Sequence, residues 1–509
     1  SHPRTRFVMT LANDYSLLSD AARAFASGRR ELFIDGEWRA PRAGRYRPVI
    51  DPSHGGAIAE VAEADAADVD DAVRAARRAF ESGPWPAMRP HEREALMLKL
   101  AELIAAEAAT IAQIETVNSG KLIQNTRLFD ADFSVYTLRY MAGWATKLHG
   151  KTMELSVPYL PGARFSGFTR LQPLGVVAGI TPWNVPLCEA VWKLAPVLAT
   201  GCTIVLKPAE QTPLTTLRLA ELCAEAGIPA GVVNVVTGSG AVAGAALVEH
   251  PGVDKINFTG STEVGRIIAG SAGPRLKKYN LELGGKSPVV IAADADLGAA
   301  IPGAAWAILG NHGQNCCAGS RLYVHRSIFD KVVEGVAEIA ASLKIGPGLD
   351  PSTGLGPMVS HAHRDRVLGY VERGVADGAS LFFGGEAVDD PGAYLRPAII
   401  VGARPTDAVV QEEIFGPVLV ATPFDDMDGV MPQLNGTSFG LGASIWSRDF
   451  DLIEDFVDRV QAGTVWINNH NTLDLSLPFG GWKQSGVGHE LGEEGLMSHL
   501  AIKAGVVRR

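Results

Sequence analysis

The chain has 509 residues, which is too long for one ordinary hydrophobic core, so we expect two or three domains. Hydrophobic residues make up 47% and charged residues 20% of the chain, a balance typical of globular proteins that argues against disorder. The net charge of −10, without a basic face, disfavours a nucleic-acid partner, and no apolar run approaches the ~20 residues needed to span a bilayer.

The cysteine content indicates a reducing environment. The five cysteines are an odd and sparse set in a long chain, which is unlike a disulfide framework and favours a cytoplasmic location. No CxxC pair and no cluster of histidines occurs, so we expect no metal site. The opening stretch, SHPRTRFVMTLANDYSLLSD, has no apolar segment ahead of a small-residue cleavage site, and we expect no signal peptide.

The first part of the chain predicts a hairpin, helices and an extended arm. The stretch ELFIDGEWRAP reads as two short strands around Asp35-Gly36. DAADVDDAVRAARRAFES predicts a helix with acidic residues in its first turn, and helical spacing continues from His91 to Val117. From Lys151 to Gln172 the sequence alternates and carries two prolines, which predicts a hairpin or arm that leaves the domain body.

From Gly175 onward, short β-branched runs alternate with helices. GVVAGI, CTIVLK, GVVNVVTG, DKINFTG and SPVVIA predict buried strands, and Pro213 to Ala226 and Ser261 to Gly270 predict helices between them. This rhythm is typical of an α/β fold with a doubly wound parallel sheet that binds nucleotides. A second α/β segment runs from Asp294 to Ile467, and the last residues, AIKAGVVRR, form a predicted strand that needs a partner edge.

Three loops at predicted strand ends are candidates for binding a dinucleotide. GSGAVA, Gly238 to Ala243, fits GxGxxG/A, but the acidic residue expected about twenty positions further on is missing, so we favour a tight turn. In NFTGSTEVGR, Ser261 caps a helix whose free N–H groups suit a pyrophosphate. Lys207 and Glu210 follow another strand and suit ribose hydroxyls, the alternative being a solvated loop pair.

The stretch GNHGQNCCAGSR holds the best candidate for a nucleophile. Small and polar neighbours leave the sulfur atoms of Cys316 and Cys317 approachable, and nearby N–H groups can stabilise an oxyanion and a thiolate. Adjacent cysteines rarely form a disulfide, because their Cα atoms are closer than that bond prefers. Cys188, Cys202 and Cys223 lie among apolar or helical neighbours and are expected to be small buried side chains.

Other polar residues are candidates for acid–base and oxyanion chemistry. Glu282 lies in an apolar strand of LELGGKSP, where burial would raise its pKa toward that of a general base; a pairing with a lysine is the alternative. Asn184 in TPWNVP can donate a hydrogen bond to an oxyanion. Glu413 and Phe415 precede a Gly-Pro turn, and the alternative there is a capped turn with a core phenylalanine.

In this order, TPWN, LKPAEQTP, FTGSTEVG, LELGGKSP, GQNCCAGSR, EEIFGPV and LPFGGWKQSGVG resemble the aldehyde dehydrogenase superfamily over nearly the whole chain. The resemblance implies an α/β fold with an NAD-binding domain (1–150 and 173–284), a catalytic domain (285–484) and a small β oligomerisation arm (151–172 and 485–509). It also implies a homodimer or homotetramer, NAD as the cofactor with NADP as the alternative, and a small aldehyde as the substrate.

The same resemblance assigns roles to individual residues. Cys316 matches the nucleophile, Glu282 the base that activates the hydrolytic water, and Asn184 with the Cys316 N–H the oxyanion hole. Lys193 and Glu490 match a proton relay. The residues that match cofactor contacts are Trp183, Lys207, Glu210, Gly260, Ser261, Glu413 and Phe415. The implied reaction is thiolate attack, hydride transfer to the nicotinamide, and hydrolysis of a thioester to a carboxylic acid.

Within the superfamily the chain looks most similar to the phenylacetaldehyde and aromatic-aldehyde branch. The residues that fall on the substrate pocket are Val185, Glu189, Trp192, Asn315, Cys317, Leu473 and Phe479. Trp192 and Phe479 suit an aryl ring. Val185, Glu189 and Leu473 depart from the family pattern, open the pocket and allow a bulkier, partly polar or cationic aldehyde, whereas His489 departs without a clear consequence.

Other functions remain open on the sequence. The same chemistry on an aliphatic, semialdehyde or amino aldehyde is the main alternative. Branches that pass the acyl group to coenzyme A commonly lack the base that Glu282 matches, so its presence favours hydrolysis. A cofactor-free thiol hydrolase would leave the cofactor motifs unused and has no obvious histidine partner for Cys316, and an inactive relative would not need the three catalytic residues.

Overall fold

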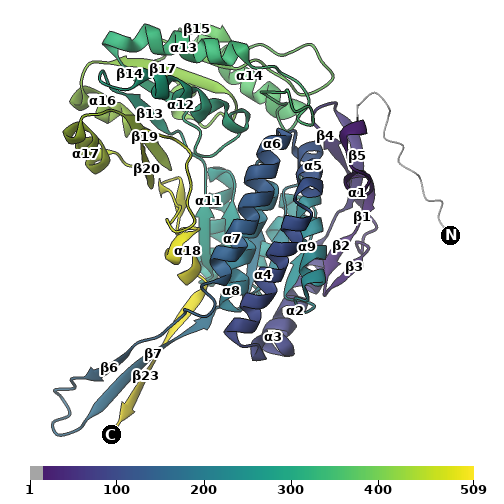
Figure 1. The fold of residues 1–509 in the computed structure, drawn as a ribbon. Helices are drawn as coiled ribbons and strands as arrows, with labels where there is room; N and C mark the ends of the chain where they lie inside the picture. Colours follow the sequence, from purple (N-terminus) through teal and green to yellow (C-terminus); the bar gives the residue numbers. More distant parts are fainter. Residues whose placement is uncertain (1–14) are drawn as a thin grey trace.

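The computed structural model describes residues 15–509 (Figure 1). Residues 1–14 lie outside that range. The expected lack of a signal peptide rests chiefly on them and stays a prediction. Within residues 15–509 two large sheets, a helical layer and a projecting three-stranded arm make up the fold (Figure 1). The predicted α/β class is confirmed.

The first large sheet has eight strands in the order β22-β12-β11-β8-β9-β10-β2-β3. These are β2 (Leu32–Ile34), β3 (Glu37–Arg39), β8 (Val176–Ile180), β9 (Thr203–Lys207), β10 (Val233–Val235), β11 (Lys255–Thr259), β12 (Lys278–Glu282) and β22 (Gly486–Val487). Strands β8 to β12 are parallel, whereas β2 and β22 join antiparallel. The predicted hairpin around Asp35-Gly36 is confirmed as β2 and β3.

The strand order reverses beside β8. From β8 the chain proceeds outward through β9 and β10, and then crosses to the other side of β8 to form β11 and β12. In open α/β sheets such a reversal leaves a crevice at the carboxyl ends of the two central strands, where ligands bind. Here the segments at that crevice follow Ile180 and Thr259, and both carry predicted site residues.

Helices cover both faces of this sheet because their apolar sides need burial. They include α2 (Ala66–Glu81), α4 (Pro90–Ala106), α5 (Ala108–Ser119), α7 (Phe133–Ala142), α8 (Pro186–Thr200), α9 (Leu214–Ala226) and α11 (Thr262–Ala272). The single helix predicted from His91 to Val117 is two helices that break at Glu107, and the helix predicted from Ser261 begins at Thr262 with Ser261 as its cap. An additional small sheet joins β1 (Gly28–Arg30), β4 (Tyr46–Asp51) and β5 (Gly56–Ala62).

The second large sheet has seven strands in the order β15-β16-β17-β14-β13-β19-β20, parallel except for β15. These are β13 (Pro288–Ile291), β14 (Arg321–His325), β15 (Ser380–Gly384), β16 (Ala398–Val401), β17 (Val418–Phe424), β19 (Gly442–Trp446) and β20 (Thr464–Ile467). Its helices are α12 (Leu297–Leu309), α13 (Phe329–Ser342), α14 (His361–Ala376), α16 (Met427–Leu434) and α17 (Phe450–Arg459). Strand β13 follows β12 closely, so a short segment carries the chain from the first large sheet to the second, and the chain returns to the first sheet at β22.

The arm is a three-stranded antiparallel sheet that projects from the body (Figure 1). It contains β6 (Thr152–Leu155), β7 (Phe165–Pro173) and β23 (Leu500–Arg508), so the terminal strand finds its partner edge in β7 of the same chain. The arm's C-terminal part is shorter than the predicted 485–509: β22 belongs to the eight-stranded sheet, and α18 (Gly492–Met497) packs against α8.

Candidate active site

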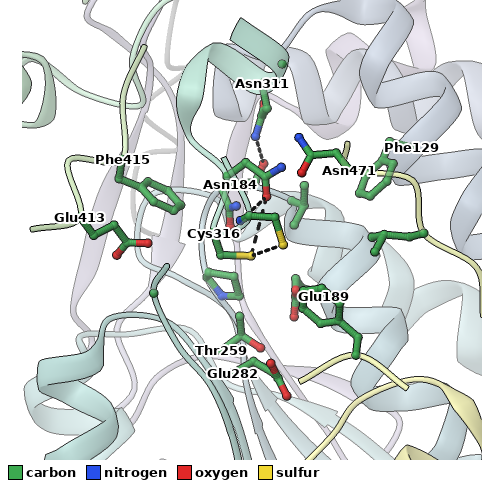
Figure 2. Close-up of a pocket in the computed structure, with 18 of the residues that line it drawn as sticks. Phe129, Asn184, Glu189, Thr259, Glu282, Asn311, Cys316, Glu413, Phe415 and Asn471 are labelled. Carbon is green, nitrogen blue, oxygen red and sulfur yellow. Dashed lines mark hydrogen bonds between the residues drawn. The ribbon is translucent and has the colours of Figure 1, made fainter. Parts of the chain in front are cut away.

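One cavity of about 1090 Å³ is lined by residues from both large sheets. Its walls come from the segments after β8, β11 and β12 and from the loops of the second sheet around Cys316, Glu413 and His470. Figure 2 places Glu413 and Phe415 on one side of Cys316, and Glu189 and Phe129 on the other. The cavity therefore has two ends that meet at a cysteine.

Cys316 lies on a tightly folded loop after α12. Asn311 and His312 take left-handed backbone angles (φ 48° and 57°) and turn the chain toward the cavity. The Ala318 N–H donates to the Asn315 carbonyl (3.0 Å), which closes a turn around the two cysteines. Cys316 is partly exposed to the cavity, whereas Cys317 is 4% exposed and packs with apolar side chains. The loop thus presents one sulfur and buries the other.

The two thiols influence each other's chemistry. Their sulfur atoms are 3.9 Å apart, and the Cys316 Sγ also lies 3.7 Å from the Asn315 Oδ1. The contact with Cys317, together with burial and nearby carboxylates, raises the pKa of Cys316 well above its ordinary value. The sequence favoured a stabilised thiolate, whereas the surroundings of Cys316 in this structure favour its neutral thiol.

Asn184 lies beside the cysteine loop, just before α8. Its Nδ2 donates to the Gln314 carbonyl (3.0 Å), and the Asn311 Nδ2 donates to the carbonyls of Asn184 (3.1 Å) and Gln314 (2.9 Å). These bonds fix the Asn184 amide next to the Cys316 loop (Figure 2) and leave its second N–H available. The arrangement can hold a developing oxyanion on an adduct of Cys316.

Glu282 ends β12 beneath Cys316 (Figure 2). It is 3% exposed, and neither carboxylate oxygen has a hydrogen-bond partner among the described residues. Burial, reinforced by the negative charge of Glu490, raises the pKa of Glu282 well above its ordinary value. An unpartnered, desolvated carboxylate close to the nucleophile is suited to accept a proton from a water or a thiol.

Lys193 lies behind Glu282 in a fully buried position. Its Nζ donates to the Glu189 Oε2 (2.9 Å), the Thr259 Oγ1 (2.6 Å) and the Glu490 Oε1 (2.8 Å). Burial lowers the pKa of Lys193, but the two carboxylates outweigh it and raise the pKa above its ordinary value. Burial also raises the pKa of Glu490 to about 7. The network thus holds a cationic lysine between two carboxylates, of which Glu490 can bind or release a proton near neutrality.

Five of the predicted cofactor residues line the other end of the cavity: Trp183, Gly260, Ser261, Glu413 and Phe415. The Ser261 Oγ accepts from the Val264 N–H (3.3 Å) at the start of α11, whose first N–H groups face this end. The Glu413 Oε1 accepts from the Gly285 N–H (3.0 Å), and the Trp183 ring makes an edge contact with Phe415 at 5.2 Å.

Lys207 and Glu210 do not line the cavity, although Ala209 between them does. The Lys207 Nζ donates to the Pro208 carbonyl (2.9 Å), and burial lowers the pKa of Lys207 to about 8. Glu210 forms an ion pair with Arg47 (2.6 Å) and accepts from the Gly240 N–H (2.7 Å). Although burial raises the pKa of Glu210, those two donors lower it below its ordinary value. The GSGAVA loop thus meets the Lys207 loop through Glu210.

The predicted substrate residues gather at the opposite end. Lining the cavity there are Val185, Glu189, Trp192, Asn315, Cys317, Leu473 and Phe479. The Trp192 ring makes edge-on contacts with Phe479 and Phe133, with ring centroids 6.0 Å and 6.2 Å apart. His489 is exposed and outside the cavity lining. This end combines an aromatic wall with one carboxylate, that of Glu189.

Several cavity residues were missed on the sequence. Phe129 lies on the π-helical turn from Thr126 to Asp132, and the His363 ring makes edge contacts with the rings of Trp183 and Phe415. His470 and Asn471 follow β20. Their position just past the end of a strand could have indicated that His470 and Asn471 belong to the site. No local sequence feature distinguished Phe129.

Among residues 15–509, no group of three or more His, Cys, Asp or Glu side chains is arranged to hold a metal ion. No helix in that range is long and apolar enough to cross a membrane. All five cysteines are free thiols.

Comparison with known proteins places the chain among aldehyde dehydrogenases. Residues 38–504 match the model of the aldehyde dehydrogenase family. The chain is 48% identical over 479 residues to phenylacetaldehyde dehydrogenase of Pseudomonas fluorescens, covering 94% of this chain and 95% of that protein. It is 42% identical over 480 residues to the mitochondrial aldehyde dehydrogenase of Homo sapiens, covering 94% and 92%.

Solved structures agree with this placement. An aldehyde dehydrogenase from Bacillus cereus, determined as an NAD⁺ complex, superposes with a TM-score of 0.94 at 43% identity, covering 96% of this chain and 99% of that one. Betaine aldehyde dehydrogenase from Staphylococcus aureus superposes with a TM-score of 0.90 at 36% identity, covering 94% of each chain. The aldehyde dehydrogenase-like fold predicted from the sequence is confirmed.

Proposed function

Since the chain belongs to the aldehyde dehydrogenase family, we propose that it oxidises an aldehyde to a carboxylic acid with NAD, through a covalent adduct on Cys316. The observation that carries this proposal is the meeting of Cys316, Asn184 and Glu282 in one cavity, although they come from three distant segments. A nucleophile, an oxyanion donor and an unpartnered base are the groups that aldehyde oxidation by way of a thioester requires.

The cavity end opposite the substrate residues suits NAD. The first N–H groups of α11 with the Ser261 hydroxyl fit a pyrophosphate, and Gly260 fits there because a Cβ would collide with the Phe258 ring. Glu413 beside Phe415 suits the ribose of the nicotinamide half, and Glu210 suits the adenosine ribose. When bound, NAD supplies the hydride acceptor that converts the first adduct into a thioester.

The first chemical step is attack of the Cys316 sulfur on the aldehyde carbon. Because the pKa of Cys316 is raised in the resting enzyme, its proton must go to a base as the S–C bond forms. The Glu282 carboxylate lies below the sulfur and has no other partner among the described residues. The new oxyanion is held by the free N–H of Asn184 and by the backbone N–H of Cys316.

The last step is hydrolysis of the thioester. Glu282 takes a proton from a water, and the resulting hydroxide attacks the acyl carbon. The C–S bond then breaks, which releases the carboxylic acid and the Cys316 thiolate. Lys193 bridges Thr259 and Glu490, next to Glu282 in the charge network. We assign to Lys193 and Glu490 the passage of the proton away from Glu282.

The substrate end supports an aromatic or arylalkyl aldehyde such as phenylacetaldehyde. The ring edges of Trp192 and Phe479 can contact an aryl group, and a relative 48% identical is a phenylacetaldehyde dehydrogenase. Val185 and Leu473 leave the wall aliphatic beside the carboxylate of Glu189. An aliphatic, semialdehyde or amino aldehyde is the alternative, and Glu189 disfavours the one with a second carboxylate.

Three further proposals complete this function. Residues 1–150 and 173–284 form the NAD-binding domain and residues 285–484 the catalytic domain. The arm joins copies of the chain into a homodimer or homotetramer, since its strands leave Ile502 and Val506 largely exposed. The free thiols support a reducing, cytoplasmic location.

The proposed function is tested by mixing the protein with NAD and a panel of aldehydes and following nicotinamide absorbance. We expect reduced cofactor with phenylacetaldehyde and a lower kcat/KM for butanal, 3-aminopropanal and succinic semialdehyde. Reduced cofactor with none of them would overturn the oxidoreductase proposal and favour a cofactor-free thiol hydrolase. Product formation that depends on added coenzyme A would replace hydrolysis with acyl transfer.

A further inference from the structure

His470 makes two hydrogen bonds that connect the substrate wall to the nucleophile loop. Its Nε2 lies 2.8 Å from the Cys317 carbonyl oxygen, and its Nδ1 lies 2.7 Å from the Ser444 Oγ. A carbonyl only accepts, so Nε2 must carry the proton, and Ser444 therefore donates its hydroxyl proton to Nδ1. Both nitrogens are used, and the tautomer is fixed.

The His470 ring is held by two residues of neighbouring strands, Trp466 and Ser444. It packs on the indole of Trp466 with ring centroids 4.7 Å apart, and the Trp466 Nε1 donates to the Thr472 carbonyl (2.7 Å). Ser444 is fully buried in β19 and Trp466 lies in β20. Burial lowers the pKa of His470 to about 4, so the ring is neutral at working pH and keeps this hydrogen-bond pattern.

The bond to the Cys317 carbonyl holds the peptide between Cys317 and Ala318, the second peptide after Cys316. The Cys317 N–H donates to the Asn315 Oδ1 (3.3 Å), and the Cys317 carbonyl accepts from His470, so both sides of this residue are restrained. The Ala318 N–H of the same peptide donates to the Asn315 carbonyl (3.0 Å), and the Gly319 N–H donates to the Ala307 carbonyl (2.8 Å). Without His470, the Cys317 carbonyl would lose its side-chain donor, and the peptide would be held from its Ala318 N–H side alone, with more freedom to tilt.

We propose that His470 is a positioning residue for the proposed reaction: through the Cys317 carbonyl it fixes the direction of the Cys316 sulfur and of the Cys316 N–H that holds the oxyanion. His470 does not act on the substrate's reacting atoms. The segment that carries His470 also places Asn471 and Leu473 on the cavity wall. It therefore connects the substrate end of the cavity to the Cys316 loop. Misplacing a reacting group by about 1 Å can cost about 100-fold in rate.

The test compares two substitutions of His470 that differ in the donor. H470F keeps a ring that can stack on Trp466 but has no N–H, whereas H470Q keeps an N–H donor on a side chain of similar reach. We expect H470F to lower kcat with phenylacetaldehyde and NAD at least about tenfold with KM within about threefold, and H470Q to retain most of kcat. A second readout, alkylation of Cys316 by iodoacetamide in the cofactor-free protein, should slow in H470F and recover in H470Q.

The matched control is H325F. His325 also bonds a serine hydroxyl (Ser327, 2.9 Å) and contacts an aromatic ring (Phe424, 5.8 Å), but it does not line the cavity. H325F should leave kcat and the alkylation rate unchanged. Equal losses in H470F and H470Q, or an H470F enzyme within about twofold of the unmodified kcat, would overturn the proposal.

Two further results keep the test decisive. If H470F does not fold, S444A takes its place: it leaves the imidazole but removes the donor that fixes its tautomer, and it should slow alkylation of Cys316 by a smaller factor. Unchanged alkylation in S444A would then contradict the proposal. If the unmodified protein oxidises no aldehyde, the proposed function fails, whereas the alkylation rates still decide whether His470 positions Cys316.

Discussion

Cys316 and Cys317 are neighbours in the chain with opposite surroundings. Cys316 faces the cavity, whereas Cys317 packs among apolar side chains and is 4% exposed. We expect C316A to lower kcat/KM at least about 1000-fold, since the nucleophile is lost, and C317A to stay within about threefold, since a small side chain replaces a small one. Steady-state kinetics of the two purified variants check this, and equal losses would contradict the separation of roles.

The raised pKa of Glu282 predicts a rate that increases with pH. Burial keeps this carboxyl group protonated above its ordinary pKa, so the fraction that can accept a proton grows as pH rises. When hydrolysis of the thioester limits turnover, kcat should therefore rise with pH over the range above the ordinary pKa of a glutamate. A kcat–pH profile measured with saturating aldehyde tests this direction. A flat profile, or one that falls over that range, is incompatible with Glu282 as the base.

Cofactor choice is expected to depend on Glu210 and its partner Arg47. The Glu210 carboxylate repels a 2′-phosphate, while the Arg47 guanidinium at 2.6 Å offers it a counter-charge. E210Q should raise the ratio of kcat/KM for NADP over NAD about tenfold, and R47Q should lower it. Titration calorimetry with each dinucleotide measures the ratio of the two dissociation constants without catalysis, and this ratio should shift in the same direction.

The control for cofactor choice is E63Q. Glu63 also lies near Arg47 (3.6 Å), but it has no bond to Gly240. Its substitution should change the ratio less than E210Q does. An E210Q enzyme with an unchanged ratio would remove Glu210 from the adenosine site.

At the scale of elements, the segment between β12 and β13 joins the two sheets and carries the buried Lys286. Its Nζ has no hydrogen-bond partner among the described residues, and burial lowers its pKa to about 7. Burial of the charged Lys286 therefore lowers the free energy of unfolding by its full amount below about pH 7. This loss of stability decreases as pH rises toward the pKa of a lysine in the unfolded chain. K286M, which fills the same space without a charge, should raise the free energy of unfolding by about 1–4 kcal/mol at pH 7.

Denaturant unfolding at several pH values measures this effect. The advantage of K286M should shrink between about pH 7 and pH 10, because the unmodified chain regains stability there. A K286M protein that is less stable at every pH would show that Lys286 has a stabilising partner.

The arm predicts a concentration-dependent assembly. Ile502 is 70% and Val506 65% exposed on β23, in the arm that projects from the body (Figure 1). A double substitution I502K/V506K should shift the sedimenting mass to a smaller species, because two charges replace an apolar contact. K503A, on the other face of the strand, is the control. An unmodified chain that sediments as a monomer would contradict the proposed role of the arm.

At the scale of the whole molecule, local sequence patterns predicted many of the strands and helices. The strands at GVVAGI, CTIVLK and DKINFTG and the helices α9 and α11 follow from short-range hydrophobic spacing and capping, as at Ser261, and were predicted close to their bounds, whereas α8 was not predicted. The carboxyl ends of parallel strands share one sheet edge, so the order of the strands alone predicts that residues such as Asn184 and Ser261 lie near a common site.

The remaining features depend on contacts between distant segments. Nothing near Glu210 in the sequence points to Arg47, 163 residues away, and nothing near Cys317 points to His470, 153 residues away. The pKa of Cys316 was expected to fall beside backbone N–H groups but is raised, because burial and the Cys317 thiol act in the folded site alone. Side-chain pairing of this kind is set by tertiary packing rather than by local propensity.

The central claim is that Cys316 carries an acyl group that Glu282 helps to hydrolyse. The most direct measurement is peptide mass spectrometry of the E282Q protein after mixing with NAD and phenylacetaldehyde. We expect a single burst of reduced cofactor, slower than in the unmodified protein because Glu282 no longer takes the Cys316 proton, and a phenylacetyl thioester on the peptide that contains Cys316, in equal amounts. An unmodified protein that turns over while E282Q gains no acyl group, or gains it on Cys317, would contradict the account.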